Sequence, residues 1–228
     1  MGIKERQERD REAVRRAILD AARDLFVREG FQNVSIRKVA EIVEYSPAAL
    51  YGYFPSKDDI FWALADEGFR LLYGTPPDRS ELTRKPPLER VRQVFRRLYA
   101  FSVEHPAYFA LMFVDRSVPR ISREYERFSC AREMKTDLLS HVRAAVAAGT
   151  LPATVPPDVI FRMLSSAVIG VAVMRLSDRL THGEDAEALA HDVLDVTIAG
   201  LQTGLPLRSS SASCVLDEES TARDARVS

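Results

Sequence analysis

Residues 35–54 read SIRKVAEIVEYSPAALYGYF and predict two short helices joined by a brief link. Ser35 is a favourable N-cap for the first helix, and Ser46 caps the second with Pro47 at its first position, where a missing N–H is tolerated. Each helix has one apolar face, formed by Ile36, Val39, Ala40 and Val43 in the first and by Leu50 and Phe54 in the second. The link contains only Glu44 and Tyr45, which is typical of a helix-turn-helix.

The second of these helices is small-sided at its start and aromatic at its end. In a helix-turn-helix this helix lies in the major groove of DNA, so close approach requires small residues on the side that faces the groove. That side is formed by Pro47, Ala48, Ala49 and Gly52. Alanine methyls can meet thymine methyls, while Tyr51, Tyr53 and the following Lys57 can bind phosphates. The alternative interpretation of the two tyrosines is that they are core aromatics anchored at the surface.

Helices are also predicted on both sides of this unit. Upstream, Val14, Ile18, Ala21 and Leu25 have the 4-3-4 spacing of a helix that buries one face. Gly30 suits the left-handed cap of that helix, and Phe31 can fold back onto its last turn. Downstream, Pro55 stops the second short helix and residues 57–73 predict a longer one.

A series of short motifs runs in a fixed order through residues 12–72. They are Ile18-Leu19, Ala21-Ala22, Leu25-Phe26, Gly30-Phe31, Ser35-Ile36-Arg37, Val39-Ala40, Leu50-Tyr51, Tyr53-Phe54, Lys57 and Ile60. In this order they resemble the DNA-binding domain of the TetR/AcrR family of one-component regulators. The resemblance implies an all-α fold, with a helix-turn-helix domain over residues 12–72 and a helical ligand-binding and dimerisation domain over residues 86–205.

The resemblance also implies which residues contact DNA. We expect the DNA-facing set to be Ser35, Arg37, Ser46, Pro47, Ala48, Ala49, Tyr51, Gly52, Tyr53 and Lys57. Arg37 is the best candidate for a bidentate contact to guanine, worth roughly 1–3 kcal/mol of discrimination. Two positions depart from the family pattern: Glu44 replaces the usual turn glycine, and Ala48-Ala49 replaces a frequent Gly-Thr. Glu44 therefore requires a strained backbone or a different turn shape, and specificity shifts towards Arg37, methyl contacts and DNA shape.

The N-terminal residues mix both charges. The cations are Lys4, Arg6, Arg9, Arg11, Arg15 and Arg16, and the interleaved anions are Glu5, Glu8, Asp10 and Glu12. This segment either follows the DNA backbone or enters a minor groove, or it is the frayed, solvated start of a helix. The sequence alone leaves both interpretations open.

Turn-forming residues concentrate in GTPPDRSELTRKPP, residues 74–87, and predict the main internal boundary. Beyond it we expect helices over residues 88–104, 106–114, 121–148, 158–179 and 184–203. No segment alternates with a period of two, so no sheet is expected. Residues 206–228 are rich in serine and mixed charge and predict a disordered tail.

The last two predicted helices carry small residues that would let two backbones approach closely. We expect them to form a four-helix bundle in a homodimer, with an interface at Ser166, Ile169, Gly170, Val193, Val196 and Gly200. A dimer is favoured because one helix-turn-helix contacts few bases, whereas two reach half-sites about 34–36 Å apart. The alternative is that both are ordinary core helices of a monomer.

Aromatic and methionine side chains in the second half suggest a pocket for an apolar effector. The candidate ligand-binding residues are Phe95, Tyr99, His105, Tyr108, Phe109, Met112, Phe113, Phe128 and Phe161. The polar candidates at such a pocket are His105, Tyr108, Arg116 and His141. A plain hydrophobic core is the alternative interpretation.

Charge, cysteine content and hydrophobic runs indicate the compartment in which we expect the protein to act. With 32 Lys and Arg against 33 Asp and Glu the formal charge is −1, so DNA would have to meet a local patch. Cys130 and Cys214 have no partner at metal or redox spacing, and the N-terminus lacks the apolar core of a signal peptide. The most lipid-like run, residues 168–174, is shorter than the roughly 18–20 residues of a spanning helix. We therefore expect a cytoplasmic protein.

These features predict a homodimeric repressor that a small apolar molecule releases from a palindromic operator. The ligand would favour a dimer whose recognition helices are wrongly spaced. The alternatives are a helical adaptor that kept the fold without binding DNA, and an all-α enzyme. An enzyme is disfavoured because the four histidines lack metal-ligand spacing and no phosphate-binding glycine loop occurs, so neither metal nor cofactor is expected.

Overall fold

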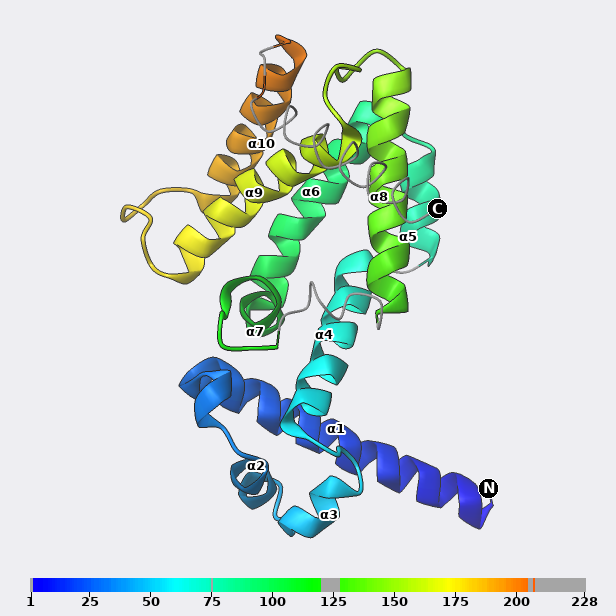
Figure 1. Ribbon diagram of the computed structural model, residues 1–228, viewed down its shortest axis with the longest axis vertical. Helices are drawn as coiled ribbons and strands as arrows, with labels where there is room; N and C mark the ends of the chain where they lie inside the picture. The colour runs from blue at the N-terminus through cyan, green and yellow to red at the C-terminus, as the bar shows by residue number, and fades with distance from the viewer. Residues whose placement is uncertain (1, 75, 120–127, 205–206, 208–228) are drawn as a thin grey trace, which may run out of the picture. The chain divides into compact units, whose positions relative to one another are not determined.

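The computed structural model of the chain describes residues 2–74, 76–119, 128–204 and 207 (Figure 1). Every regular element within these ranges is a helix, which confirms the predicted all-α class. The elements are α1 (Ile3–Glu29), η1 (Phe31–Asn33), α2 (Ile36–Ile42), α3 (Pro47–Tyr51), α4 (Lys57–Tyr73), α5 (Pro76–Thr83), α6 (Pro87–Glu104), α7 (Pro106–Phe109), η2 (Ala110–Val114), α8 (Ser129–Ala147), α9 (Pro157–Leu176) and α10 (Ala186–Gln202).

The chain divides into two compact units that do not follow the order of the sequence. Unit 1 contains residues 1–74 together with residues 101–133, and unit 2 contains residues 75–100 together with the chain from residue 134 onward. The last residues of α6, from Phe101, therefore belong to unit 1, as do α7 and η2. A segment from the middle of the chain thus packs with the N-terminal helices.

Three aromatic rings mark the core of unit 1. The ring of Phe31 lies 5.0 Å from that of Phe26 on α1 and 5.7 Å from that of Phe61 on α4, measured between centroids. Gly30 has φ 79°, a conformation that favours glycine, and its N–H donates to the carbonyl of Phe26 at 2.9 Å. The chain can therefore leave α1 and return Phe31 to the core, which confirms the end predicted for the first helix.

The second half of unit 1 packs against α1 and α4 through α7 and η2. Gly68 on α4 is buried beneath this contact. A Cβ atom at Gly68 would collide with the sulfur of Met112 and would lie 3.3 Å from Cδ1 of Tyr108. The absent side chain therefore sets how closely α7 and η2 approach α4.

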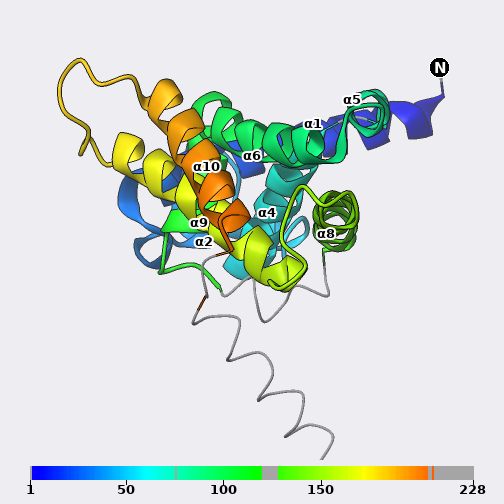
Figure 2. The same ribbon diagram turned by 90° about the horizontal axis from the view of Figure 1, so that it is seen from above.

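Unit 2 contains the antiparallel pair α9 and α10, which lie along one another in both views (Figures 1 and 2). Their contact buries Ile160 and Leu164 on α9 and Leu194 and Ile198 on α10. An ion pair between Arg92 on α6 and Asp195 on α10, 2.8 Å from Nε to Oδ1, joins a third helix to the pair. The rings of Phe95 on α6 and Phe161 on α9 lie 5.9 Å apart.

Several sequence expectations about elements need correction. The stretch 74–87 contains a helix, α5, because prolines are tolerated in a first helical turn. The helix expected over residues 106–114 is α-helical only in α7 and continues as a π-helical turn in η2. α1 begins at Ile3 and the side chains of residues 4–13 are exposed, which agrees with a solvated helix start, one of the two interpretations of this segment.

Two further predictions concern the C-terminal half. The helix expected over residues 121–148 is described as α8 from Ser129, while residues 120–127 and the tail from residue 208 lie outside the described residues. Counted over its whole length, α9 is long and apolar enough to cross a membrane, contrary to the estimate from residues 168–174. One such helix is weak evidence for a membrane span, and α9 packs on α10 with 33% of its apolar window buried inside the chain.

Candidate nucleic-acid interface

Each of the two helices of the helix-turn-helix begins at a serine that caps its N-terminus. The hydroxyl of Ser35 accepts a hydrogen bond from the N–H of Lys38 at 3.2 Å, and that of Ser46 accepts from the N–H of Ala49 at 3.1 Å. Pro47 occupies the first turn of α3. Each cap stabilises its helix by roughly 1 kcal/mol relative to alanine, so both serines have a structural role besides any contact with DNA.

The turn between α2 and α3 has Glu44 in a left-handed conformation, with φ 58°. The N–H of Glu44 donates to the carbonyl of Glu41 at 3.4 Å, and the N–H of Tyr45 donates to that of Ala40 at 3.0 Å. A residue with a side chain in this left-handed conformation makes the folded state about 1–2 kcal/mol less stable than glycine would. The strained backbone expected at Glu44 is therefore present.

The outward side of α3 has the small surface that the sequence predicted. Pro47, Ala48, Tyr51 and Gly52 are exposed, Ala49 and Tyr53 are half-buried, and Leu50 and Phe54 are buried. Tyr51 is 55% exposed, so it is not a core aromatic. On α2, Arg37 is exposed. α3 ends at Tyr51, which places Tyr53 and Phe54 just beyond the helix.

Two exposed residues of this surface were missed. Ile42 is 51% exposed at the end of α2 and Tyr45 is 44% exposed in the turn. A signal was available, because Ile42 lies off the face formed by Val39 and Val43. Exposed apolar side chains beside α3 can meet thymine methyls, as alanine does.

Lys57 has partners inside the protein. Its Nζ donates to the carbonyl of Phe31 at 2.7 Å and lies 4.2 Å from the centre of the Phe31 ring. An ammonium group has three donors, so one bond to a carbonyl leaves two for a phosphate. Lys57 therefore ties α4 to η1, which follows α1, in addition to its predicted role at DNA.

Two arginines of α1 lie against the aromatic residues that follow α3. The guanidinium carbon of Arg11 lies 5.9 Å from the ring centre of Tyr53, and that of Arg15 lies 5.3 Å from the ring centre of Phe54. Both distances are those of cation–π contacts. These pairs could not be predicted from the sequence, because the partners are about forty residues apart and meet only in the folded unit.

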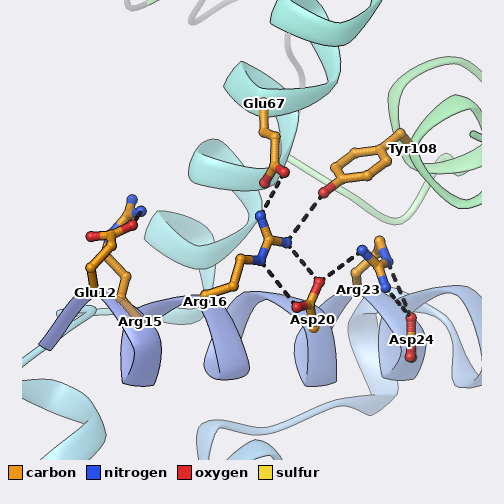
Figure 3. A network of polar contacts seen from close by, with 8 residues as sticks. All are labelled: Glu12, Arg15, Arg16, Asp20, Arg23, Asp24, Glu67 and Tyr108. Atoms are coloured by element: carbon orange, nitrogen blue, oxygen red, sulfur yellow. Dashed lines mark hydrogen bonds and ion pairs between the residues drawn. The ribbon is translucent and has the colours of Figure 1, made fainter. Parts of the chain in front are cut away.

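A polar network joins α1, α4 and α7 in unit 1 (Figure 3). Arg16 on α1 forms an ion pair with Glu67 on α4 at 2.5 Å, and it donates to Asp20 at 2.7 Å and to the Tyr108 hydroxyl at 3.4 Å. These bonds, led by that to Asp20, raise the pKa of Arg16 above its usual range although burial opposes the shift. Arg23, which also pairs with Asp20, has its guanidinium carbon 5.5 Å from the Tyr108 ring centre.

The candidate ligand-binding residues fall into both units. Phe95, Tyr99 and Phe161 belong to unit 2, whereas His105, Tyr108, Phe109, Met112, Phe113 and Phe128 belong to unit 1. In unit 1 the rings of Phe109 and Phe113 lie 5.0 Å apart, while Phe128 packs on Phe69 at 5.5 Å. The set therefore does not form one cluster within either unit. Of the polar candidates, Arg116 is exposed and His141 is buried on α8.

The residues predicted for the dimer interface share an accessible part of α9 and α10. Val196 is 70% exposed, Ser166 and Gly170 are exposed, and Ile169, Val193 and Gly200 are half-buried. A Cβ atom at Gly170 or Gly200 would meet no atom within 4 Å. These glycines are therefore not required by packing inside the chain.

No group of three or more His, Cys, Asp or Glu side chains in the described ranges is arranged to hold a metal ion.

Two protein-family models match the chain. One, described as bacterial regulatory proteins of the tetR family, matches residues 18–64. The other, described as a tetracyclin repressor-like C-terminal domain, matches residues 91–197. The first range contains α2 and α3, and the second contains α7, η2 and most of α10.

Two curated proteins are similar in sequence. An uncharacterised HTH-type transcriptional regulator of Haemophilus influenzae is 26% identical over 155 residues, which cover 68% of this chain and 79% of that protein. The HTH-type transcriptional repressor Rv1474c of Mycobacterium tuberculosis is 38% identical over 55 residues, which cover 24% of this chain and 29% of that protein.

Solved structures share the fold. FadR from Bacillus subtilis in complex with stearoyl-CoA gives a TM-score of 0.64 at 16% identity, covering 81% of this chain and 97% of that chain. Thermus thermophilus FadR in complex with lauroyl-CoA gives 0.55 at 22% identity, covering 85% and 96%. MexZ, a repressor of Pseudomonas aeruginosa, gives 0.63 at 20% identity, covering 83% and 95%.

Proposed function

Because this chain belongs to the TetR family of bacterial transcriptional regulators, we propose that it is a homodimeric repressor that a small apolar molecule releases from a palindromic operator. The family and the fold are those of regulators rather than enzymes. The observation that carries the proposal is the exposed small side of α3, which follows a tight turn from α2 and is held from behind by the buried Leu50 and Phe54.

DNA binding is proposed to use α2 and α3 together. The small residues from Pro47 to Gly52 admit α3 to a major groove, and Arg37 reads a guanine. Tyr51, Tyr53 and Lys57 bind phosphates, which fixes the register of the helix without specifying a sequence. Such regulators act in the cytoplasm, where the operator lies.

Dimerisation is proposed to cover the outer face of α9 and α10. A valine that is 70% exposed, beside glycines with open space above them, is favourable for contact with a second copy. In an isologous interface the same residues of both copies meet, so two helices from each copy would form a four-helix bundle.

The effector is proposed to be apolar, with a long-chain acyl-CoA as the class to test first. Thermus thermophilus FadR, a TetR-family repressor, forms a complex with lauroyl-CoA, and the transcriptional regulator FadR of Bacillus subtilis, which shares the fold, forms one with stearoyl-CoA. The aromatic and methionine side chains of the second half of the chain provide apolar surface of the kind that an acyl chain requires.

The polar network in unit 1 supplies a route for coupling the two functions. Tyr108 lies in the range of the C-terminal family model, yet its hydroxyl and ring contact Arg16 and Arg23 on the first DNA-binding helix. A ligand that displaced α7 would change these contacts and with them the position of α1. By thermodynamic linkage, such a ligand would change operator affinity only by the factor by which it binds one of the two arrangements of α7 and α1 more tightly than the other.

The experiment that tests DNA recognition compares Arg37→Ala and Lys57→Ala on the operator and on random duplexes at several salt concentrations. We expect Arg37→Ala to lose about 1–3 kcal/mol on the operator only, since a base contact carries discrimination. Lys57→Ala should weaken binding to both duplexes and reduce the salt slope by about 0.9.

Arg28→Ala serves as a control, because Arg28 is an exposed cation near the end of α1. Thermal melts of all variants separate binding from folding, which matters for Lys57 because it bonds to Phe31. An equal loss on operator and random DNA for Arg37→Ala would contradict the assigned roles.

A further inference from the structure

Residues 4–13 of α1 form a helical stretch in which every side chain is exposed. The helix itself begins at Ile3. As a continuation of the packed part of α1 this stretch needs no nucleation of its own, but it gains little from packing inside the chain. The question is therefore what this extension faces.

One face of the extension is aligned with the residues that follow α3. With about 100° per residue, Lys4 and Arg11 differ by about 20° around the helix, and Arg15 lies within about 40° of Arg11. The position of that face in unit 1 is fixed by two contacts, Arg11 on Tyr53 and Arg15 on Phe54. By this spacing Lys4 lies on the same face as Arg11, on the N-terminal part of α1, which extends past α3 (Figure 1).

Two cations on this face are not neutralised within the part of the chain that the structure describes. Neither Lys4 nor Arg11 has a carboxylate within ion-pair distance, whereas Arg15 pairs with Glu12 at 3.6 Å and Arg16 pairs with Asp20 and Glu67. Lys4 and Arg11 are thus cations without an ion pair on a face that also carries Glu8, and Arg11 lies against Tyr53, which is itself a predicted phosphate contact.

We propose that Lys4 and Arg11 bind backbone phosphates that flank the segment read by α3, so that the helical extension of α1 lengthens the footprint of each half-site. Seven residues of helix span about 10 Å, which equals about three base steps along duplex DNA. The proposal rests on the proposed DNA-binding function. Because the segment is helical, it follows the backbone outside the groove rather than entering a minor groove as an extended arm.

A substitution of Glu8 also tests the proposal, because it is expected to raise DNA affinity rather than lower it. It lies about 40° from Lys4 around the helix and is exposed, so its carboxylate would face the same phosphates. Glu8→Gln should therefore tighten DNA binding, while the loss of either cation should weaken it.

The experiment measures affinity against salt for a duplex that the wild-type protein selects from a random pool. Variants are Arg11→Ala, Lys4→Ala, Arg11→Lys and the control Arg6→Ala, whose cation lies about 140° from Arg11 and about 160° from Lys4 around the helix. Each alanine variant at Lys4 or Arg11 should reduce the slope of log affinity against log salt by about 0.9, and Arg6→Ala should leave it unchanged. Shortening the duplex to the two half-sites should abolish the difference.

Arg11→Lys separates charge from stacking, because lysine keeps the charge but loses the planar contact with Tyr53. A wild-type slope in Arg11→Lys supports the phosphate contact, and behaviour like that of Arg11→Ala would overturn it in favour of a role in positioning Tyr53. Equal slopes in Arg11→Ala, Lys4→Ala and Arg6→Ala would also overturn it. Failure of the wild-type protein to select any duplex would instead contradict the proposed function.

Discussion

At the scale of single residues, Glu44 shows a conflict between local preference and the geometry of the motif. The helix-turn-helix requires a left-handed residue between α2 and α3, and the chain provides a glutamate there with φ 58°. This conformation lowers the free energy of unfolding by about 1–2 kcal/mol, and the contacts made by the two capped helices offset the loss.

Glu44→Gly should raise the free energy of unfolding by roughly 0.5–1 kcal/mol. Removal of the side chain relieves the left-handed strain, and the greater flexibility of glycine in the unfolded chain offsets part of the gain. The control Glu44→Gln removes the charge but keeps the strain. Denaturant unfolding checks the pair, and an equal gain in both variants would mean that charge, not backbone strain, is the cause.

His141 on α8 introduces a dependence of stability on pH. Burial lowers the pKa of His141, the nearby Arg90 lowers it further, and Asp137, 3.9 Å away, opposes the shift. The neutral imidazole is thus favoured in the folded state, so the unfolded chain binds more protons as the pH falls below about 6.5. This contribution to stability is present above that pH and is lost as the pH falls through the folded pKa.

His141→Gln should therefore flatten the fall in melting temperature between about pH 7 and pH 5, relative to wild type. His182→Gln is the matched control, because His182 is exposed. Melting curves across this range check the prediction, and an unchanged slope in His141→Gln would show that other groups cause the pH dependence.

At the scale of elements, the sequence predicted best where a helix carries its own start and stop signals. α4 has the predicted bounds, residues 57–73, because a serine caps its start and a glycine follows its end. α5 was missed because proline-rich composition does not distinguish a turn from a first helical turn. The π-helical turn η2 was not predictable, since it packs against α1 and α4, which are distant in the sequence.

The contact of α4 with η2 depends on Gly68. Gly68→Ala should lower the free energy of unfolding by about 1 kcal/mol, because overpacking against Met112 and Tyr108 outweighs the higher helix propensity of alanine. The double variant Gly68→Ala, Met112→Ala should lose less than the sum of the single losses, since the cavity at Met112 admits the new methyl. Additive losses in denaturant unfolding would contradict direct contact.

At the scale of the whole molecule, sequence order is a poor guide to what packs together. Residues 101–133 follow the predicted domain boundary, yet they cluster with the DNA-binding helices. The DNA-facing surface was nonetheless predictable, because cap, glycine and aromatic signals all lie within twenty residues. The ligand set and the pairs of α1 with Tyr53 and Phe54 were not, since both depend on contacts between distant segments.

The proposed dimer makes a prediction about association. Val196→Arg should convert the protein to monomers, because the side chain would place two charges at the centre of an isologous interface. Val27→Arg is the matched control, as Val27 is also exposed, at 47%, but lies on α1. Light scattering after size exclusion gives the mass, and a dimer that persists in Val196→Arg would place the interface elsewhere.

The central claim is that two copies of the chain read a palindromic operator through α2 and α3. It is tested most directly by sequencing the genomic DNA fragments that the purified protein retains. We predict enrichment of a short inverted repeat whose half-sites lie about 34–36 Å apart, centre to centre, and loss of that enrichment in Arg37→Ala. Retention of fragments without any shared motif, or of none, would contradict the claim.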